Sequence, residues 1–209
     1  MKKTDSVSKN TTELTALSAI ILMTVFFVLN YYFNIEVLYI IAIIFLIIGF
    51  QFGVRVIVGN VVPRFKHKIN VESKWFKTKS FEEKLFKKLN VKKWKNKAPV
   101  YDPEEFDFEK NTEDQLIINM CNAEIVHEVN ILSGYISLIF VIFLGYVWLF
   151  FIGAILGTGM DLIFVIIQRF NRPRMIRYLN RKNYVNGEKK FDTWTLGMFL
   201  KVYQAEIKF

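Results

Sequence analysis

The sequence predicts an all-α, polytopic helical membrane protein with four transmembrane helices in two hairpins and an amphipathic cytoplasmic segment. Three uncharged stretches carry this prediction: residues 15–33, 37–53 and 129–160. About 20 helical residues cross the roughly 30 Å apolar core of a bilayer, so each stretch reads as a span. The third stretch continues, largely apolar, to residue 167 and is long enough for two spans. Three spans, one of them long and tilted, is the alternative.

The first two stretches predict a hairpin with a very short outer turn at Asn34-Ile35-Glu36. The first span is not expected to be a cleaved signal peptide, because its apolar core is longer than about 7–15 residues and no A-x-A-like site follows it. The second hairpin has no polar loop. It is expected to turn either near Gly145–Trp148 or at the glycines between Gly153 and Gly159.

The distribution of Lys and Arg predicts the topology. Residues 59–128 hold 14 Lys and Arg and residues 169–209 hold 10, whereas the first turn has none. Positive charge near the ends of spans stays in the cytoplasm. We therefore expect a multi-pass protein of the cell membrane with both termini in the cytoplasm. The predicted segments are an N-terminal tail (1–13), a first transmembrane hairpin (14–58), a basic cytoplasmic loop with an interfacial helix and a motif helix (59–128), a second transmembrane hairpin (129–168) and a basic C-terminal tail (169–209).

The basic loop is predicted to contain a short amphipathic helix. Ser80 and Glu83 have the spacing of a capping box, and Phe81, Leu85 and Leu89 follow at helical spacing with lysines between them. A basic helix with flanking tryptophans is typical of an element that lies on anionic lipid. The alternative is a solvated helix packed on its own protein. Nucleic-acid binding fits poorly in a loop tethered between membrane spans.

A second helix is predicted to begin at Thr112, which forms a capping-box pattern with Gln115. It continues through "CNAEIVHEVN", where Glu124, His127 and Glu128 share one face. The helix is expected to enter the bilayer near residue 129. Asp161 lies inside the last span, where a carboxylate costs about 2.5–3.5 kcal/mol and usually turns inward to a partner. We expect it to face the Glu124 and His127 cluster.

An arginine-rich segment follows the last span. Arginine has a planar set of donors that suits phosphate and carboxylate, so this run predicts an anion site, although a positive-inside signal would look the same. Pro173 is expected to break or redirect the chain there. The arginines are Arg169, Arg172, Arg174, Arg177 and Arg181.

These residue types suit acyl transfer to a hydroxyl, which needs a base for the alcohol proton and charge stabilisation of the oxyanion. His127 is the candidate base, because histidine changes charge near neutral pH. Glu124 or Glu128 is the candidate group that orients it, and Glu124 is preferred. The arginines near Asn171 could hold the phosphates of a coenzyme A donor. A structural histidine at the membrane boundary is the alternative.

Other chemistries fit the sequence less well. A metal site could use Glu124-x-x-His127, but helix-bundle metal sites carry two such motifs and this chain has one, so no metal is expected. Cys121 is a weak candidate nucleophile because it lies nearly two turns from His127. The sequence contains no glycine-rich phosphate loop and no G-x-S-x-G elbow, which argues against a nucleotide-driven pump or a soluble-type hydrolase.

Three motifs together resemble the glycosyl-4,4'-diaponeurosporenoate acyltransferase family of small membrane proteins: "VKKWKNKAPV", "CNAEIVHEVN" and "IIQRFNRPRMIRYLNRK". Their order and spacing match the family over roughly residues 75–182. The resemblance implies acylation of a carotenoid-linked sugar, and it implies a catalytic role for Glu124 and His127. The other matching positions, with Arg174 added from the arginine run, are candidate substrate-binding residues: Trp94, Lys95, Gln168, Arg169, Asn171, Arg172 and Arg174.

The sequence therefore predicts a membrane-bound acyltransferase that moves a fatty acyl group from a thioester to a hydroxyl of a lipid or lipid-linked sugar. Acyl-CoA or acyl-carrier protein is the expected donor. Membrane lipids and an amphiphilic acceptor are the expected partners, and no bound cofactor is expected. The alternative is a non-catalytic membrane scaffold or accessory protein that binds anionic lipid or a partner.

Overall fold

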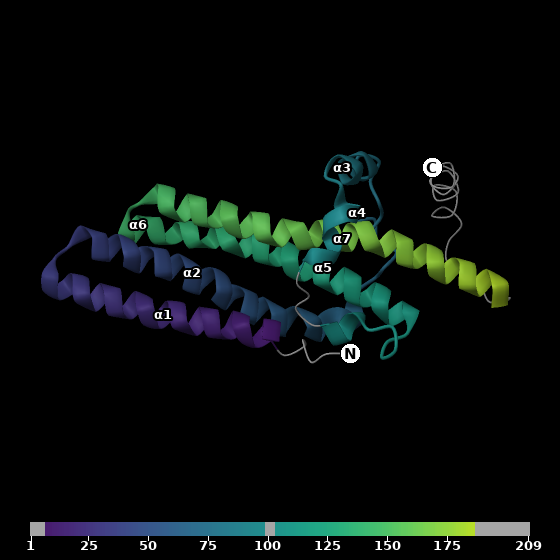
Figure 1. The fold of residues 1–209 in the computed structure, drawn as a ribbon, viewed down its shortest axis with the longest axis horizontal. Helices are drawn as coiled ribbons and strands as arrows, with labels where there is room; N and C mark the ends of the chain where they lie inside the picture. Colours follow the sequence, from purple (N-terminus) through teal and green to yellow (C-terminus); the bar gives the residue numbers. More distant parts are fainter. Residues whose placement is uncertain (1–6, 99–102, 187–209) are drawn as a thin grey trace.

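The computed structural model describes residues 7–98 and 103–186. Within those residues the protein is all-helical and has no strand. Two long antiparallel hairpins lie side by side (Figure 1). The first consists of α1 (Val7–Phe33) and α2 (Glu36–Val61), and the second of α5 (Glu113–Ile136) and α7 (Val147–Asn186). The predicted fold class is confirmed. The outer parts of the two predicted tails, residues 1–6 and 187–209, lie outside the described residues.

Four helical segments are long and apolar enough to cross a membrane: Asn10–Phe33, Glu36–Lys68, Glu113–Leu144 and Val147–Arg181. Large apolar side chains on them point outward, including those of Leu17, Ile142 and Phe143. Soluble proteins rarely expose apolar patches of this extent. The structure is therefore compatible with a multi-pass membrane protein, and it contains four candidate spans instead of three with one long tilted helix.

Both hairpins reverse direction at the same end of the bundle (Figure 1). Asn34 in the first turn and Gly145 and Tyr146 in the second have positive φ angles of 50°, 69° and 52°. Glycine and asparagine adopt this region at the lowest cost, which explains why the helices stop there. The second hairpin thus turns at the first of its two predicted places, and the glycines between Gly153 and Gly159 remain helical within α7.

Contacts near these turns join the two hairpins. The Tyr146 hydroxyl donates a hydrogen bond to Glu36 Oε1 at 2.7 Å, and the Tyr39 hydroxyl donates to the Leu144 carbonyl at 3.3 Å. Below them a buried apolar cluster includes Ile43 of α2 and Phe150 of α7. The two hairpins therefore form one packed bundle.

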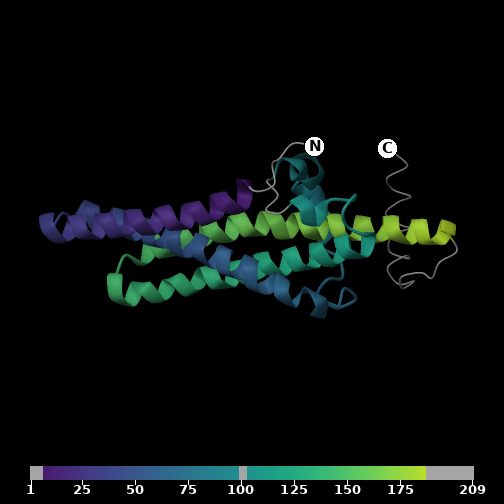
Figure 2. The same ribbon diagram turned by 90° about the horizontal axis from the view of Figure 1, so that it is seen from below.

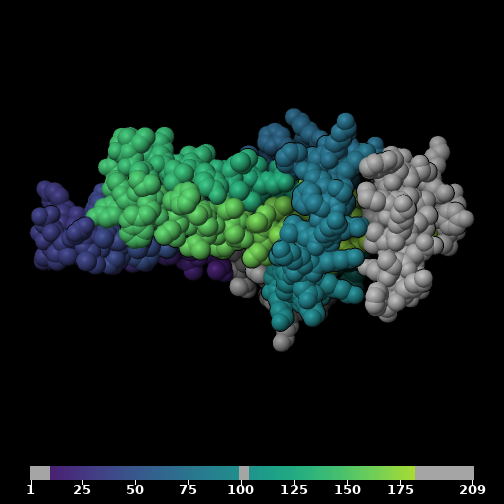
Figure 3. All heavy atoms as spheres, turned by 90° about the horizontal axis from the view of Figure 1, so that it is seen from above, coloured from purple at the N-terminus to yellow at the C-terminus, as the bar shows by residue number. Residues whose placement is uncertain are grey.

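The chain between α2 and α5 gathers at the other end of the bundle, where its described residues form short helices: η1 (Val62–Lys68), α3 (Glu82–Lys88), α4 (Val91–Trp94), η2 (Lys95–Lys97) and η3 (Pro103–Phe106). Figure 2 shows this segment on the flank of the long helices. In Figure 3 it forms a blue-to-teal block that crosses α7. Two short 3₁₀ and α segments, η4 (Ser137–Phe140) and α6 (Val141–Leu144), complete the second hairpin.

The predicted interfacial helix corresponds to α3, and it packs on its own protein through two buried side chains, those of Glu82 and Phe86. Phe86 is buried against Phe170 of α7, with ring centroids 5.6 Å apart in an edge-to-face arrangement. Phe81 and Trp75 remain exposed. The segment is therefore anchored to α7 and still presents aromatic side chains outward.

One of the two predicted capping boxes forms. Thr112 caps α5, with its hydroxyl accepting from the Gln115 N–H and the Gln115 side chain accepting from the Thr112 N–H. The box predicted at Ser80 and Glu83 is wrong, because α3 starts at Glu82 without a side-chain cap. The Glu82 carboxylate instead accepts the Lys79 N–H and pairs with Arg169 of α7. A tertiary ion pair thus replaces the local motif.

The predicted break at Pro173 is also wrong, because α7 continues through this residue to Asn186. Proline removes one backbone donor and strains the preceding turn. Here the residue before it, Arg172, is buried and bonded to α5 and to the loop. These tertiary bonds hold the helix in register where the isolated sequence favours a break.

Candidate functional site

A buried polar network lies between α2, α5 and α7, centred on Asp161. Oδ1 of Asp161 lies 2.9 Å from His127 Nδ1 and accepts a weaker bond from Asn130 Nδ2 at 3.4 Å. Oδ2 accepts from Arg55 Nη2 at 2.6 Å. We call these four residues the Asp161 network. The expectation that Asp161 turns inward toward His127 is confirmed.

The ring of His127 is held on two sides. It stacks on Phe164 of α7 with centroids 4.7 Å apart and planes 12° from parallel. A carboxylate can only accept hydrogen bonds, so Nδ1 is the nitrogen that carries a hydrogen toward Asp161. In a neutral imidazole, Nε2 then keeps its lone pair. This is the arrangement in which a histidine can take a proton from a hydroxyl.

Glu124 does not contact His127, although the sequence suggested that it would. Its side chain is completely buried and pairs with two arginines of α7, Arg172 and Arg169, the latter through Nε at 3.0 Å. Arg169 also pairs with Glu82. We call Glu82, Glu124, Arg169 and Arg172 the arginine cluster. The carboxylate that contacts His127 is therefore that of Asp161, whereas the carboxylate of Glu124 is engaged by the arginines.

The arginine cluster also fastens the loop to the bundle. Arg169 Nη2 donates to the Trp75 carbonyl at 2.7 Å, and Arg172 Nη2 donates to the Phe76 carbonyl at 2.6 Å. The Trp75 indole N–H in turn donates to Glu128 at 2.8 Å. Arg169 and Arg172, predicted to bind anions, are thus engaged within the chain. Their donors close residues 75–82 onto α5 and α7.

A second group, here called the Lys95 group, consists of Lys95 of η2 with Asn171 and Arg174 of α7. Lys95 Nζ donates to Asn171 Oδ1 at 2.8 Å and lies 5.5 Å from the centre of the Phe170 ring. The Arg174 guanidinium stacks on the same ring at 3.5 Å. Burial and the nearby Arg174 charge lower the pKa of the Lys95 ammonium group. The structure thus brings together Lys95, Asn171 and Arg174, three of the candidate substrate-binding residues.

The remaining predicted substrate-binding residues lie beside this group. The Trp94 indole N–H donates to the Leu89 carbonyl at 2.9 Å, and its side chain packs near Phe170. Gln168 is buried on α7, directly before Arg169 in the sequence. Across the described ranges, no three His, Cys, Asp or Glu side chains come together as a metal site would require.

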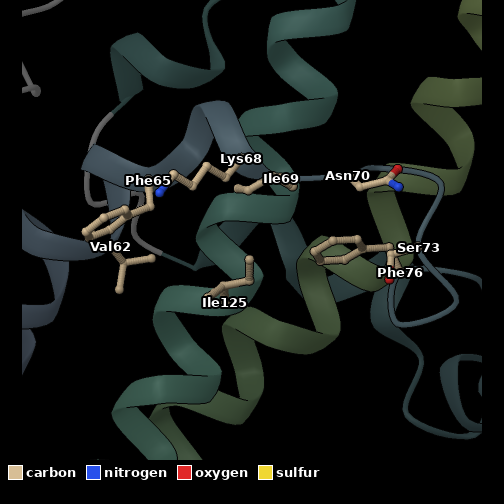
Figure 4. A pocket seen from close by; sticks show the side chains of 8 residues that line it. All are labelled: Val62, Phe65, Lys68, Ile69, Asn70, Ser73, Phe76 and Ile125. Atoms are coloured by element: carbon tan, nitrogen blue, oxygen red, sulfur yellow. The ribbon is translucent and has the colours of Figure 1, made fainter.

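A pocket of about 450 Å³ opens between η1, the loop residues 69–76 that follow it, and α5 (Figure 4). Figure 4 shows Phe65 and Val62 on one side and Phe76 on the other, with Ile125 of α5 between them. Lys68, Asn70 and Ser73 add polar groups to an otherwise apolar lining. Because the Phe76 carbonyl accepts from Arg172, the pocket adjoins the arginine cluster.

Cys121 is expected to be inert as a nucleophile. Its side chain projects from α5 and is fully buried. A thiol must be accessible as a thiolate to react. A water-soluble maleimide should therefore leave the folded protein unlabelled and modify it fully after unfolding, as mass spectrometry of the intact chain would report. Rapid labelling under native conditions would contradict the buried placement.

Sequence reasoning missed Arg55 and Glu82. Arg55 is the only charged residue of α2 after Glu36. A lone charge in a span is a recognised pointer to a functional or structural partner, so this signal was present. Glu82 carried no comparable signal, because acidic residues are common in the first turn of exposed helices.

Comparison with known families gives a match to the glycosyl-4,4'-diaponeurosporenoate acyltransferase family over residues 72–181. Comparison with curated proteins and with solved structures gives no match. The matched region is slightly more than half of the chain. It contains the arginine cluster, His127, Asp161 and the Lys95 group, and it leaves out the first hairpin with Arg55. On this match the chain belongs to the glycosyl-4,4'-diaponeurosporenoate acyltransferase family.

Proposed function

We propose that the protein transfers a fatty acyl group from a thioester donor to a hydroxyl of a lipid or lipid-linked sugar. One observation carries the proposal: His127 Nδ1 lies 2.9 Å from a buried carboxylate of Asp161, within the region that matches an acyltransferase family. This pairing leaves His127 Nε2 as a base. The same division of roles between a carboxylate and a histidine operates in hydrolase triads.

The proposed step moves one proton and exchanges one bond. His127 Nε2 takes the proton of the acceptor hydroxyl as its oxygen attacks the thioester carbonyl. A carbon–oxygen bond forms, the carbon–sulfur bond breaks, and the departing thiolate receives the proton from His127. Asp161 accepts the Nδ1 hydrogen bond throughout and stabilises the positive charge that develops on the imidazole.

Charge distribution supports a reaction at the cytoplasmic face, with the termini and the basic loop on that side of the cell membrane. Acyl-CoA and acyl-carrier protein both carry a phosphate at the end of the pantetheine arm opposite to the thioester. Lys95 and Arg174 offer two cations for such a phosphate, with Asn171 holding Lys95 in place. The exposed aromatic side chains of Trp75 and Phe81 would keep an amphiphilic acceptor close to the loop.

The test is comparative lipidomics of a host that expresses the wild type, His127→Gln or His67→Gln at equal membrane levels. His67 is the only other histidine and lies exposed on η1, which makes its variant the matched control. We expect an acylated lipid or glycolipid with the wild type and His67→Gln and none with His127→Gln. Identical profiles for all three proteins and for a deletion strain would remove the catalytic assignment.

A non-catalytic scaffold is the alternative, and one observation favours it. Arg169 and Arg172 bond to Glu82, Glu124 and two backbone carbonyls, so the most arginine-rich motif serves internal packing. On this reading His127 is a packing residue between Asp161 and Phe164. The same lipid comparison separates the two functions, because a scaffold predicts no product that depends on His127.

A further inference from the structure

Arg55 lies in the first hairpin, outside the family match, yet it reaches the proposed catalytic pair. It projects from α2 to α7, where Nη2 donates to Asp161 Oδ2 at 2.6 Å and to the Gly157 carbonyl at 3.3 Å. Its Nη1 donates to the Gln51 carbonyl at 2.9 Å. The side chain is about 13% exposed and that of Asp161 about 3%. The guanidinium is therefore fixed in place by three partners.

The helices are shaped for this approach. Gln51, one turn before Arg55, packs against Gly134 of α5 and Gly157 of α7. A Cβ atom built on Gly157 would lie 2.8 Å from Gln51 Oε1, so a larger residue there would require the Gln51 side chain to shift. Gln51 Nε2 also donates to the Gly134 carbonyl at 3.4 Å. The first hairpin is thus docked with its polar side chains directed into the second.

The two oxygens of Asp161 divide its partners. Oδ2 faces Arg55, and Oδ1 faces His127 and Asn130. A carboxylate buried among apolar helices keeps its negative charge only when a cation pairs with it, and arginine remains charged at every physiological pH. A neutral residue in place of Arg55 would leave this carboxylate without its counter-charge, and His127 is the group beside it that could supply a positive charge instead, as an imidazolium. An imidazolium carries hydrogen on both ring nitrogens, so Nε2 of His127 would lose its role as an acceptor.

We propose that Arg55 is a positioning residue that holds Asp161 as a carboxylate and thereby keeps His127 in the tautomer with hydrogen on Nδ1. The first hairpin is thus part of the active site, although the family match does not include it. The inference rests on the proposed function for its consequence in catalysis. Its consequence for the tautomer can be measured without any activity.

The tautomer of His127 can be measured because the sequence contains only two histidines, His67 and His127. In a His67→Gln background, ¹⁵N-histidine labelling reports on His127 alone, and solid-state NMR of the full chain in lipid nanodiscs distinguishes protonated from unprotonated ring nitrogens. Three further substitutions are compared in this background. Arg55→Gln removes the charge, Arg55→Lys keeps it, and Arg64→Gln removes a charge from an exposed position on η1 as the matched control.

We expect one protonated nitrogen, Nδ1, in the parent, in Arg64→Gln and in Arg55→Lys. In Arg55→Gln, Nε2 should become protonated. The rate of acyl transfer in Arg55→Gln should fall about a hundredfold in kcat, the range that a general base contributes. KM should stay within about twofold of the parent value, because Arg55 touches no substrate. The loss of kcat in Arg55→Lys is expected to be smaller than in Arg55→Gln, because lysine keeps the positive charge. If Arg55→Gln does not accumulate in the membrane, the kcat of Arg55→Lys relative to the parent still tests the proposal.

Two results would overturn the inference: an Nε2-protonated ring in the parent protein, or an unchanged Nδ1 tautomer in Arg55→Gln. The NMR result and the lipid result can also disagree, if the tautomer responds to Arg55→Gln as expected while the lipid products do not depend on His127. This combination has its own meaning. It supports the role of Arg55 in fixing the imidazole and rejects the proposed acyl transfer. The two failures are therefore distinguishable.

Discussion

Glu124→Gln is expected to destabilise the folded protein by about 3–5 kcal/mol, because it removes one partner from a buried group of charges. The substitution keeps the size of the side chain, so the loss arises from charge. Arg169 would then keep its ion pair with Glu82, whereas the buried Arg172 would lose its carboxylate partner. The loop over residues 75–82 depends on the same arginines through their bonds to two carbonyls. We expect it to loosen as well.

The measurement is the rate at which Cys121 reacts with a maleimide during heating or addition of denaturant in detergent. Cys121 is the only cysteine and lies one turn from Glu124, so its exposure reports on this part of the bundle. The control is Glu128→Gln, four residues along α5, which loses only an exposed bond to Trp75. We expect a change of about 1 kcal/mol or less there. Equal stability of Glu124→Gln and the wild type would contradict the structural role of the arginine cluster.

Asp161→Asn is expected to reduce acyl transfer by about 10⁴-fold, the loss caused by the same change in a hydrolase triad, where the histidine takes the wrong tautomer. An amide can present its N–H₂ group to His127 Nδ1, which would move the hydrogen to Nε2. Asparagine also leaves Arg55 buried without its counter-charge. Part of the effect will therefore appear as lower stability, which Cys121 protection measures separately.

The activity would be measured with the protein in nanodiscs, using the donor and acceptor that lipidomics identifies. Asp114→Asn is the matched control, because Asp114 lies exposed in the first turn of α5. A folded Asp161→Asn protein with activity near that of the wild type would exclude Asp161 as the group that orients His127. It would also leave Arg55 without a role in the reaction.

Local patterns determined much of the architecture. The uncharged stretches predicted four spans and two tight turns, because crossing a bilayer requires long apolar helices whatever their neighbours. Gly145 ended a helix as its backbone freedom suggests, and Thr112 with Gln115 capped α5. The candidate base was found because histidine is rare in this chain and His127 stands at the border of an apolar stretch.

Local sequence patterns did not predict which charged groups pair with one another. Glu124 shares a helical face with His127, yet its carboxylate binds arginines that lie far away in sequence. Likewise Glu82 pairs with Arg169 where the sequence suggested a helix cap, and Pro173 lies within a continuous helix. In each case a buried ion pair or hydrogen bond between distant segments outweighs a local preference of about 1 kcal/mol or a single lost backbone bond.

The sequence by itself thus determined the helical membrane architecture, the two hairpins and the segment that carries the site, since these follow from hydrophobicity and backbone preferences along the chain. Only the tertiary structure decided that Asp161 faces His127, that Glu124 belongs to the arginine cluster and that Arg55 reaches across from the first hairpin. The physical reason is the strength of electrostatics in a buried environment. A buried charge must find an opposite charge, and which one it finds depends on how the helices pack.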